Sequence, residues 1–409
     1  MALILLLALA GGVAVGNVYF PQVVTPSVAA DLGVTPAMAA QVVTATQFGY
    51  AAGIVLLVPL GDRIPHRRLI VSLLVLTGLG LLAAGSAPTL GTLLAAGVFV
   101  GVTTVIGPII GPMAAGLVSE DRRGMVSGVL LSGGLGGMLL SRTFGGALAQ
   151  WLGWRAPYLV AAALVLIIAL VLLRTLPTTT PPSAQRYPAL LAGSLRLLRT
   201  EPELRRSCLY QATVFAGFSA VWTSVTLLLT GPAYGLEASA VGVLALVNAA
   251  TMVCTPIAGR QVDRRGPDKV NLVCLIAVIA SSPVLAAGGL GGTLGLAGLA
   301  LGSLLLDIAM QSGMVANQVR VYGLRPEARS RLTTAYMACA YVGGAAGSWL
   351  GTGAYGQAGW PGVCALVALL AALALARHLM TVHAHTPRTH TRTARVVRGG
   401  DGQGVPRVR

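Results

Sequence analysis

Uncharged apolar runs recur along the whole chain and constrain its fold more than any other feature. They cover residues 1–30, 32–61, 69–119, 156–173, 207–236, 238–259, 270–306 and 332–376. A helix needs about 20 apolar residues to cross a bilayer, so the longer runs hold two crossings joined by a short turn. Only 10% of the 409 residues are charged, whereas soluble domains carry about 25%. We therefore expect an all-α membrane protein.

Breaks within these runs divide them into separate spans. Turn residues and aromatic residues mark the breaks near Pro26, Pro88, Trp151, Gly231, Gly291 and Gly356. Splitting the runs there predicts twelve transmembrane helices, which begin near residues 3, 38, 69, 91, 125, 156, 206, 238, 270, 294, 331 and 361. The expected units are six-helix bundles at 1–174 and 206–382, a cytoplasmic linker with an amphipathic helix at 175–205, and a basic, disordered tail at 383–409.

Basic residues indicate the orientation of the chain. Most of its 28 Lys and Arg residues stand in six groups that all fall on one side of a twelve-span protein. By the positive-inside rule that side is the cytoplasm, and both termini lie there. The net charge of +16 then reflects topology and contact with anionic lipids, so nucleic-acid binding is not needed to explain it. Because the first span begins at Met1 without a basic flank, we expect a short leader to precede it.

The two halves of the chain repeat the same charged loops. “VPLGDRIPHRR” (58–68) follows the second span, and “AGRQVDRRGPDK” (258–269) follows the eighth. “SEDRRGMVSG” precedes the fifth span and “RPEARSRLTTA” precedes the eleventh, in register. Two parallel six-helix repeats with a cytoplasmic linker resemble the major facilitator superfamily over essentially the whole chain. The resemblance is to bacterial permeases that expel drugs or metabolites by proton coupling, and it implies a multi-pass protein of the bacterial cytoplasmic membrane.

The loop motif of that superfamily has the form G-x-x-x-D-R-x-G. Its second copy keeps all four positions, as Gly259, Asp263, Arg264 and Gly266. The first copy keeps Asp62 and Arg63 but has other residues in place of the glycines. The resemblance implies that the aspartate lies by the N-terminal end of a helix in the opposite half, and that the arginine pairs with an acid after the fourth span, where the sequence has Glu120, Asp121 and Arg122. Such contacts would close the cytoplasmic face; the alternative is a plain positive-inside loop.

Small residues mark one face of the fifth span. Ser127, Gly134, Gly137, Ser141 and Gly145 share that face. Gly128, Gly137, Ser141, Gly145 and Gly146 stand in a spacing that resembles the antiporter motif of the superfamily, with its central Gly-Pro replaced by Ser-Arg. Small residues let a neighbouring backbone approach closely, as an interface that must rock requires. The replaced proline, and a fourth span that lacks the arginine usual in such antiporters, put the motif's association with antiport in doubt.

Two lone charges stand inside the predicted spans. Arg142 lies in the fifth span, and Asp307 is the only acid between Val270 and Val319. In the superfamily the tenth span lines the central cavity, and burial disfavours the charged form of a carboxyl group, so Asp307 could take up and release a proton there. We consider three arrangements: a direct Asp–Arg pair, an Arg142 that binds an anionic substrate while Asp307 carries the proton, and a structural Arg142 bonded to helix carbonyls.

Further polar and aromatic residues are candidates for the substrate cavity. In the seventh and tenth spans, helical spacing places them on a single face, as Gln211, Phe215, Phe218 and Trp222 and as Gln311 and Gln318. The first span offers Asn17, Tyr19 and Gln22, and the second offers Gln47. Packing or hydrogen bonding between helices is the alternative explanation for each of them.

These features predict a secondary active transporter and not an enzyme. No metal site, cofactor or nucleotide motif is expected, and the five cysteines fit small apolar core residues. Proton-coupled efflux of a small organic molecule is favoured because the fifth-span motif partly survives. The alternatives are proton-linked uptake of a small, anionic metabolite and a transport-inactive membrane sensor. The expected partners are the substrate, H⁺ and membrane lipids, and the protein is expected to be a monomer.

Overall fold

The structure of this chain is a computed structural model, and it describes all residues except 120–122, 178–186, 238, 326–327 and 386–409. The helices of the first half are α1 (Ala2–Tyr19), α2 (Pro21–Leu32), α3 (Pro36–Leu56), the 3₁₀-helix η1 (Val58–Asp62), α4 (His66–Gly85), α5 (Leu90–Thr103), α6 (Gly107–Gly116), α7 (Arg123–Leu152) and α8 (Arg155–Thr175). Those that follow are α9 (Tyr187–Thr200), α10 (Pro202–Thr230), α11 (Ser239–Val247), η3 (Asn248–Ala250), α12 (Thr251–Arg265), α13 (Pro267–Ala286), η4 (Ala287–Leu290), α14 (Gly292–Leu324) and α15 (Arg329–His385).

These helices reproduce the predicted spans. Nine of them, within the described residues, are long and apolar enough to cross a membrane. α15 counts once among the nine although Gly359, with φ of 63°, breaks it into two helices. The two remaining predicted spans are α7 and the continuous run α11–η3–α12. The all-α membrane fold is therefore confirmed, with each helix starting within about four residues of its predicted position.

The internal repeat of the sequence is also a repeat of packing. α1 packs on α7 in the first half as α10 packs on α15 in the second. α3 packs on α5 as α12 does on α14, and α4 on α8 as α13 does on α15. Since equivalent helices contact equivalent partners, the two halves are pseudo-symmetric bundles. The residue limits assigned to these units stay a prediction.

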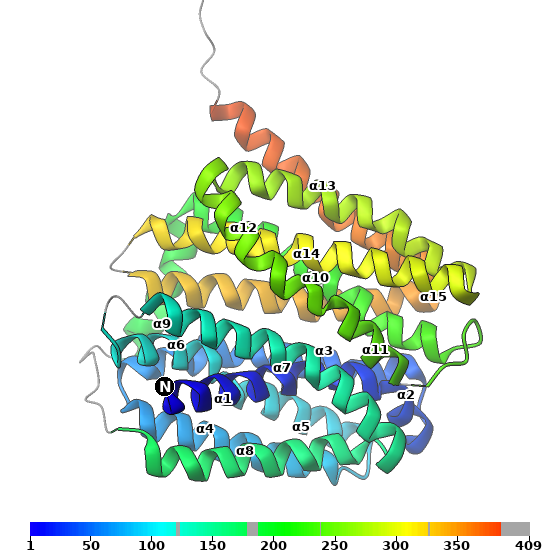
Figure 1. Ribbon diagram of the computed structural model, residues 1–409, viewed down its shortest axis with the longest axis horizontal. Coiled ribbons are helices and arrows are strands. Elements are labelled where there is room, and N and C mark those ends of the chain that lie inside the picture. Colours follow the sequence, from blue (N-terminus) through cyan, green and yellow to red (C-terminus); the bar gives the residue numbers. More distant parts are fainter. Residues whose placement is uncertain (120–122, 178–186, 238, 326–327, 386–409) are drawn as a thin grey trace, which may run out of the picture.

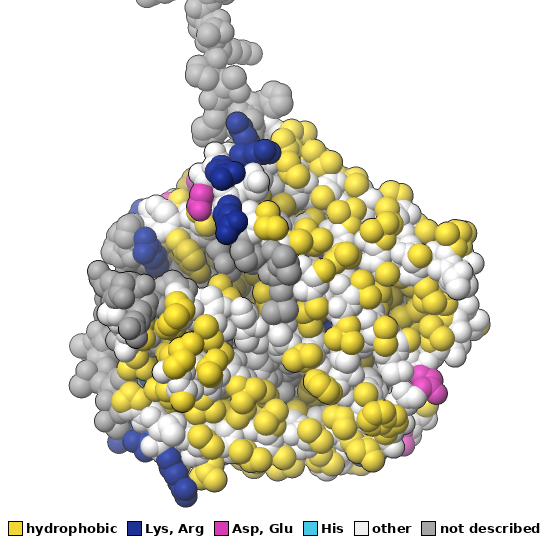
Figure 2. Space-filling model, viewed as in Figure 1, with side chains coloured by type: hydrophobic (Ala, Val, Ile, Leu, Met, Phe, Trp, Pro, Cys, Tyr) yellow, Lys and Arg dark blue, Asp and Glu magenta, His cyan; other side chains and the backbone are white. Residues whose placement is uncertain are grey.

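The bundle has two charged ends and an apolar side. Figure 1 shows the N-terminus and α9 at one end, which we call the terminal face, and α2 and α11 at the other, which we call the distal face. In the view of Figure 2, Lys and Arg lie towards the terminal face while hydrophobic side chains cover most of the surface between the ends. Such a belt fits the hydrocarbon layer of a membrane.

The halves contact each other near the distal face. Thr44 of α3 donates a hydrogen bond to Ser348 of α15 at 3.2 Å, and Thr143 of α7 donates to the carbonyl oxygen of Gly242 of α11 at 3.0 Å. α12, which continues from α11, packs on α13 and α14 (Figure 1). The seam between the halves is thus closed distally, where α7 meets α11.

Candidate substrate and coupling site

Arg142 is fully buried in α7, at a solvent exposure of 0%. Its Nε and Nη2 donate to Oε1 of Gln22, in α2, at 3.1 and 2.9 Å. Because α1 and α2 meet at Phe20 with helical dihedrals, Gln22 continues the first span past its middle and reaches α7. The partner of Arg142 is therefore a side-chain amide, in place of the helix carbonyls considered above.

Aromatic rings surround the guanidinium group. Its Cζ lies 3.9 Å from the ring centroid of Trp222, 5.1 Å from that of Tyr19 and 5.5 Å from that of Phe218. A cation over an aromatic face gains about 2 kcal/mol when both groups are desolvated. Trp222 and Phe218 belong to α10, so these contacts cross the seam between the halves.

Trp222 also contacts the second lone charge. Its Nε1 donates to Oδ1 of Asp307, in α14, at 3.1 Å, and the carboxylate is 2% exposed. Within the described part of the chain, Arg142 and Asp307 form no direct ion pair. The indole instead bridges them, with its face to the cation and its edge to the anion. A three-residue array thus stands in place of the direct pair, which was one of the three arrangements considered.

Several buried polar atoms in this region have no hydrogen-bond partner among the residues that the structure describes. They include the donors Arg142 Nη1 and Gln22 Nε2 and the acceptors Gln47 Oε1 and Gln311 Oε1. Most buried polar groups in proteins are hydrogen-bonded, and an unmet group costs more in a membrane, where lipid offers no alternative partner. The region therefore has the unmet hydrogen-bonding capacity expected of a binding site.

The other candidate residues divide into two groups. Gln47 donates to Ser219 at 3.4 Å across the seam, and Phe215 stacks on Phe218 at 5.4 Å between centroids. Asn17, Gln211 and Gln318 are placed elsewhere. Asn17 donates to Thr104 at 3.3 Å and Gln211 accepts from Tyr336 at 2.8 Å. Gln318 is eleven residues beyond Asp307, about 16 Å further along α14.

Sequence reasoning missed two contributors. Tyr341 of α15 has its hydroxyl 3.5 Å from that of Tyr19 and its ring centroid 4.4 Å from that of Tyr50. Near the terminal face, Asp268 accepts from Arg206 and, at 2.5 Å, from Arg320, which joins α13, α10 and α14. Asp268 stands directly after the second loop motif, and this position in the sequence could have identified it as a candidate.

The two loop motifs differ in structure. In the second copy α12 runs to Arg265 and ends at Gly266, whose φ of 80° favours glycine. In the first copy the chain forms η1, and Pro65 precedes α4. Asp263, Arg264 and Arg63 are exposed, a Cβ at Gly259 would meet open space, and the residues 120–122 expected to partner the arginine lie outside the described residues.

Asp62 is half-buried in the first motif. His66 and Arg331 lie near enough to act electrostatically on its carboxyl group. Arg331 stands at the start of α15, in the opposite half. The part of Asp62 in closing the cytoplasmic face stays a prediction.

The small residues of α7 pack against α1, in the same half. A Cβ at Gly137 would lie 2.0 Å from the carbonyl oxygen of Gly12, and one at Gly145 would lie 3.1 Å from Phe20 Cβ. Ser141 Cβ lies 3.0 Å from the position of a Cβ on Gly16. Gly146 is buried, and a Cβ at Gly128 would meet open space. The close approach therefore tightens one bundle, and the seam lies on another part of α7.

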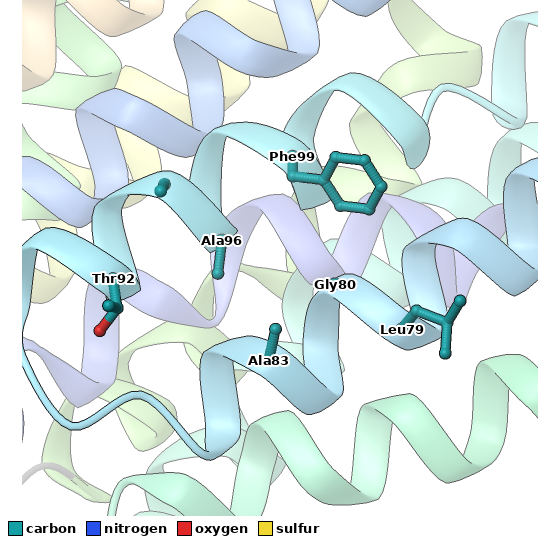
Figure 3. Close-up of a pocket in the computed structure, with 7 residues that line it drawn as sticks. Leu79, Gly80, Ala83, Thr92, Ala96 and Phe99 are labelled. Atoms are coloured by element: carbon teal, nitrogen blue, oxygen red, sulfur yellow. The ribbon is translucent and has the colours of Figure 1, made fainter.

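Two shallow apolar grooves open on the side of the bundle. One, of about 380 Å³, lies between α4 and α5 and is lined by Leu79, Gly80, Ala83, Thr92, Ala95, Ala96 and Phe99 (Figure 3). The other, of about 570 Å³, lies between α3 and α15, with Thr44 and Trp349 among its lining residues. Neither includes Arg142 or Asp307, and their apolar walls fit contact with lipid.

Comparison with known proteins agrees with this architecture. The family model of the Major Facilitator Superfamily matches residues 7–301 and 243–400. The chain belongs to this superfamily. A transporter of Escherichia coli O157:H7, YgaY, is 37% identical over 370 residues, which cover 90% of this chain and 93% of the relative. A transporter of Streptomyces coelicolor, SCO4007, is 34% identical over 365 residues, with coverage of 88% and 83%.

A solved structure shares the fold. The nucleoside transporter NupG, solved as a mutant, superposes with a TM-score of 0.74 at 14% identity, covering 92% of this chain and 98% of that one. At this identity the likeness concerns the fold alone. As a member of the superfamily, the chain is a multi-pass membrane transporter of small molecules.

Proposed function

We propose that this chain is a proton-coupled secondary active transporter and that Asp307 carries the proton. The observation that supports this most is the buried array Arg142–Trp222–Asp307, which spans the seam between the halves. A carboxylate that lies deep in an apolar bundle and is joined through Trp222 to a cation of the opposite half can link its protonation to the relative position of the halves. No catalytic role is proposed for any residue.

The proposed cycle is a rocking of the two halves about this array. The distal seam is closed in this structure by the pairs Thr44–Ser348 and Thr143–Gly242. The basic residues of the terminal face support a cytoplasmic position for that face, by the positive-inside rule. The proposed location is the bacterial cytoplasmic membrane, with both termini inside and the protein monomeric. The closed distal seam then corresponds to a state that is shut towards the outside.

Two directions of transport are considered. The glycine pattern of α7 favours efflux by antiport through its resemblance to the family motif. In the structure those glycines pack on α1, so their contacts themselves say nothing about the direction of transport. Proton-linked uptake requires that substrate and proton bind to the same state. Arg142 Nη1 and Gln22 Nε2, as unmet donors, favour a substrate that accepts hydrogen bonds, and this supports the second candidate.

A thermal-shift screen of purified protein at about pH 6 and pH 8 tests the proposal. A ligand that stabilises the wild type to different extents at the two pH values should lose that difference in Asp307→Asn. Asp401→Asn, the same change in the C-terminal tail, is the matched control. If the pH difference survives in Asp307→Asn, Asp307 is not the proton site. Flux of the same ligand into proteoliposomes separates a transporter from a sensor, which would bind without flux.

A further inference from the structure

The donors around Arg142 define what they can receive. A guanidinium group has five N–H donors, and two of its nitrogens donate to Gln22 Oε1. Nη1 is unpartnered, so the edge formed by Nη1 and Nη2 is available for the two parallel bonds that a carboxylate accepts. Because the oxygen of Gln22 must face the arginine, its Nε2 is fixed as a second unmet donor.

The same surroundings exclude a cation. The aromatic faces of Trp222, Tyr19 and Phe218, which would otherwise receive an organic cation, already hold the guanidinium group. A second positive charge there would be repelled by Arg142 in a region with little water to screen it. The unmet donors and the occupied aromatic faces thus favour a negatively charged ligand.

We infer that the transported substrate is a small organic carboxylate, that Arg142 and Gln22 bind it, and that it binds together with the proton. The inference rests on the proposed function and adds the substrate class to it. With Asp307 ionised, the pair Arg142 and Asp307 is neutral, and an anion would leave the site with a net negative charge. Protonation of Asp307 removes that charge. Each ligand therefore raises the affinity for the other, since such coupling is reciprocal.

Few charged groups act on Asp307, so the coupling between its protonation and anion binding should dominate the pH dependence of binding. Arg142, from α7, is the charged group that acts on it, and Trp222 of α10 is its hydrogen-bond donor. Tyr19 lies against Arg142, and Tyr341 contacts Tyr19 and Tyr50. All three are phenols, which stay neutral near pH 7. The anion and the proton therefore cross the membrane in the same direction, whereas in antiport they cross in opposite directions.

The test uses a panel of small carboxylates (acetate, lactate, benzoate, salicylate) with benzamide and benzylamine as neutral and cationic probes. Binding to the detergent-purified full chain is measured by calorimetry between about pH 5.5 and pH 8. At least one carboxylate should bind more tightly as the pH falls, by up to tenfold per pH unit for one linked proton. Benzamide and benzylamine should bind more weakly and without that pH dependence.

Gln22→Glu is the sharpest variant. The new carboxylate would pair with Arg142 as an internal anion, so the protein should stay folded while binding of the carboxylate falls at least tenfold. Gln403→Glu, the same change in the C-terminal tail, should leave binding unchanged. Arg142→Lys keeps the charge without the two parallel donors and should weaken binding while keeping its pH dependence.

The outcomes separate the inference from the proposed function. If no carboxylate binds, or if Gln22→Glu binds one as tightly as the wild type, the inference is wrong and water satisfies the unmet donors. If benzylamine binds and weakens as the pH falls, the substrate is a cation and antiport holds, so the inference fails while Asp307 stands as the proton site. If Asp307→Asn leaves the pH dependence of every bound ligand intact, the proposed function fails as well.

Discussion

Gly242 offers a direct test of whether the distal seam is the closed gate of this protein. A Cβ added there would lie 2.8 Å from the Cα of Thr143 and 3.3 Å from the carbonyl oxygen of Arg142. Both are backbone atoms, so no side-chain rotation relieves the contact, and α7 and α11 must separate by several tenths of an ångström or more. In Gly242→Ala we therefore expect the distal-closed state to be penalised relative to a distal-open one.

The size of the penalty follows from the cost of overpacking, about 1–3 kcal/mol. That cost corresponds to a roughly 5- to 150-fold shift of the closed-to-open ratio. The reporter is a cysteine pair at Gln150 and Glu237, whose side chains are hydrogen-bonded across the distal seam. In a background with the five native cysteines replaced, cross-linking of this pair by a short bifunctional thiol reagent, which spans the length of the two replaced side chains, should slow by at least fivefold in Gly242→Ala.

Two glycines of α7 serve as controls for the change at Gly242, which lies in α11. Gly136→Ala places its Cβ in open space and should cross-link like the parent. Gly137→Ala meets Gly12 within the same half at 2.0 Å, so it should lower the melting temperature without altering the cross-linking of folded protein. Equal cross-linking rates in Gly242→Ala and Gly136→Ala would show that the contact at Gly242 does not hold the seam closed.

Three other changes have expected outcomes. A disulfide between cysteines at Thr44 and Ser348, whose oxygens are 3.2 Å apart, should stop flux in proteoliposomes, and reductant should restore it. Asp268→Asn removes one of the two acids that Arg206 and Arg320 share, while Glu203 stays 3.3 and 3.7 Å from them; because Asp268 is half exposed and Glu203 remains, we expect a loss of about 1–2 kcal/mol in unfolding experiments, less than for a fully buried pair. Hydrogen bonds from Trp154 and Arg155 lower the pKa of Asp31, so its stabilisation is present at neutral pH and is lost as the pH falls through that lowered pKa; the difference in melting temperature between wild type and Asp31→Asn should shrink below about pH 4.

The helices and their repeat were predictable because composition encodes them directly. An uncharged run of bilayer length has few alternatives to a transmembrane helix, and equivalent charged loops mark equivalent spans. The predictions at α7 and α15 depended on such signals and agree with the structure. What these signals leave open is the rotation of each helix about its axis, which decides which side chains meet.

The candidate site shows this limit clearly. Arg142 and Asp307 were identifiable as rare charges in apolar runs, yet nothing in their spacing showed that Trp222 would contact both. Gln22 and Gln211 gave the same signal, a lone amide in a span, but one bonds Arg142 and the other bonds Tyr336. Only the packing of α2 against α7 and of α10 against α15 separates the two cases.

Under the proposed function, the position of the array couples binding to rocking. Arg142 belongs to the first half, whereas Trp222 and Asp307 belong to the second. Thr143, the next residue of α7, makes the distal contact with α11, so a motion that opens the seam also draws the guanidinium group away from the indole. That separation would leave a buried cation with fewer partners, at a cost of several kcal/mol in an apolar setting. A bound carboxylate replaces the lost interaction and lowers that cost, and a ligand shifts a conformational equilibrium only by such differential binding. In the empty transporter, the contact between Arg142 and Trp222 would therefore resist opening of the seam, and the bound carboxylate would take the place of that contact.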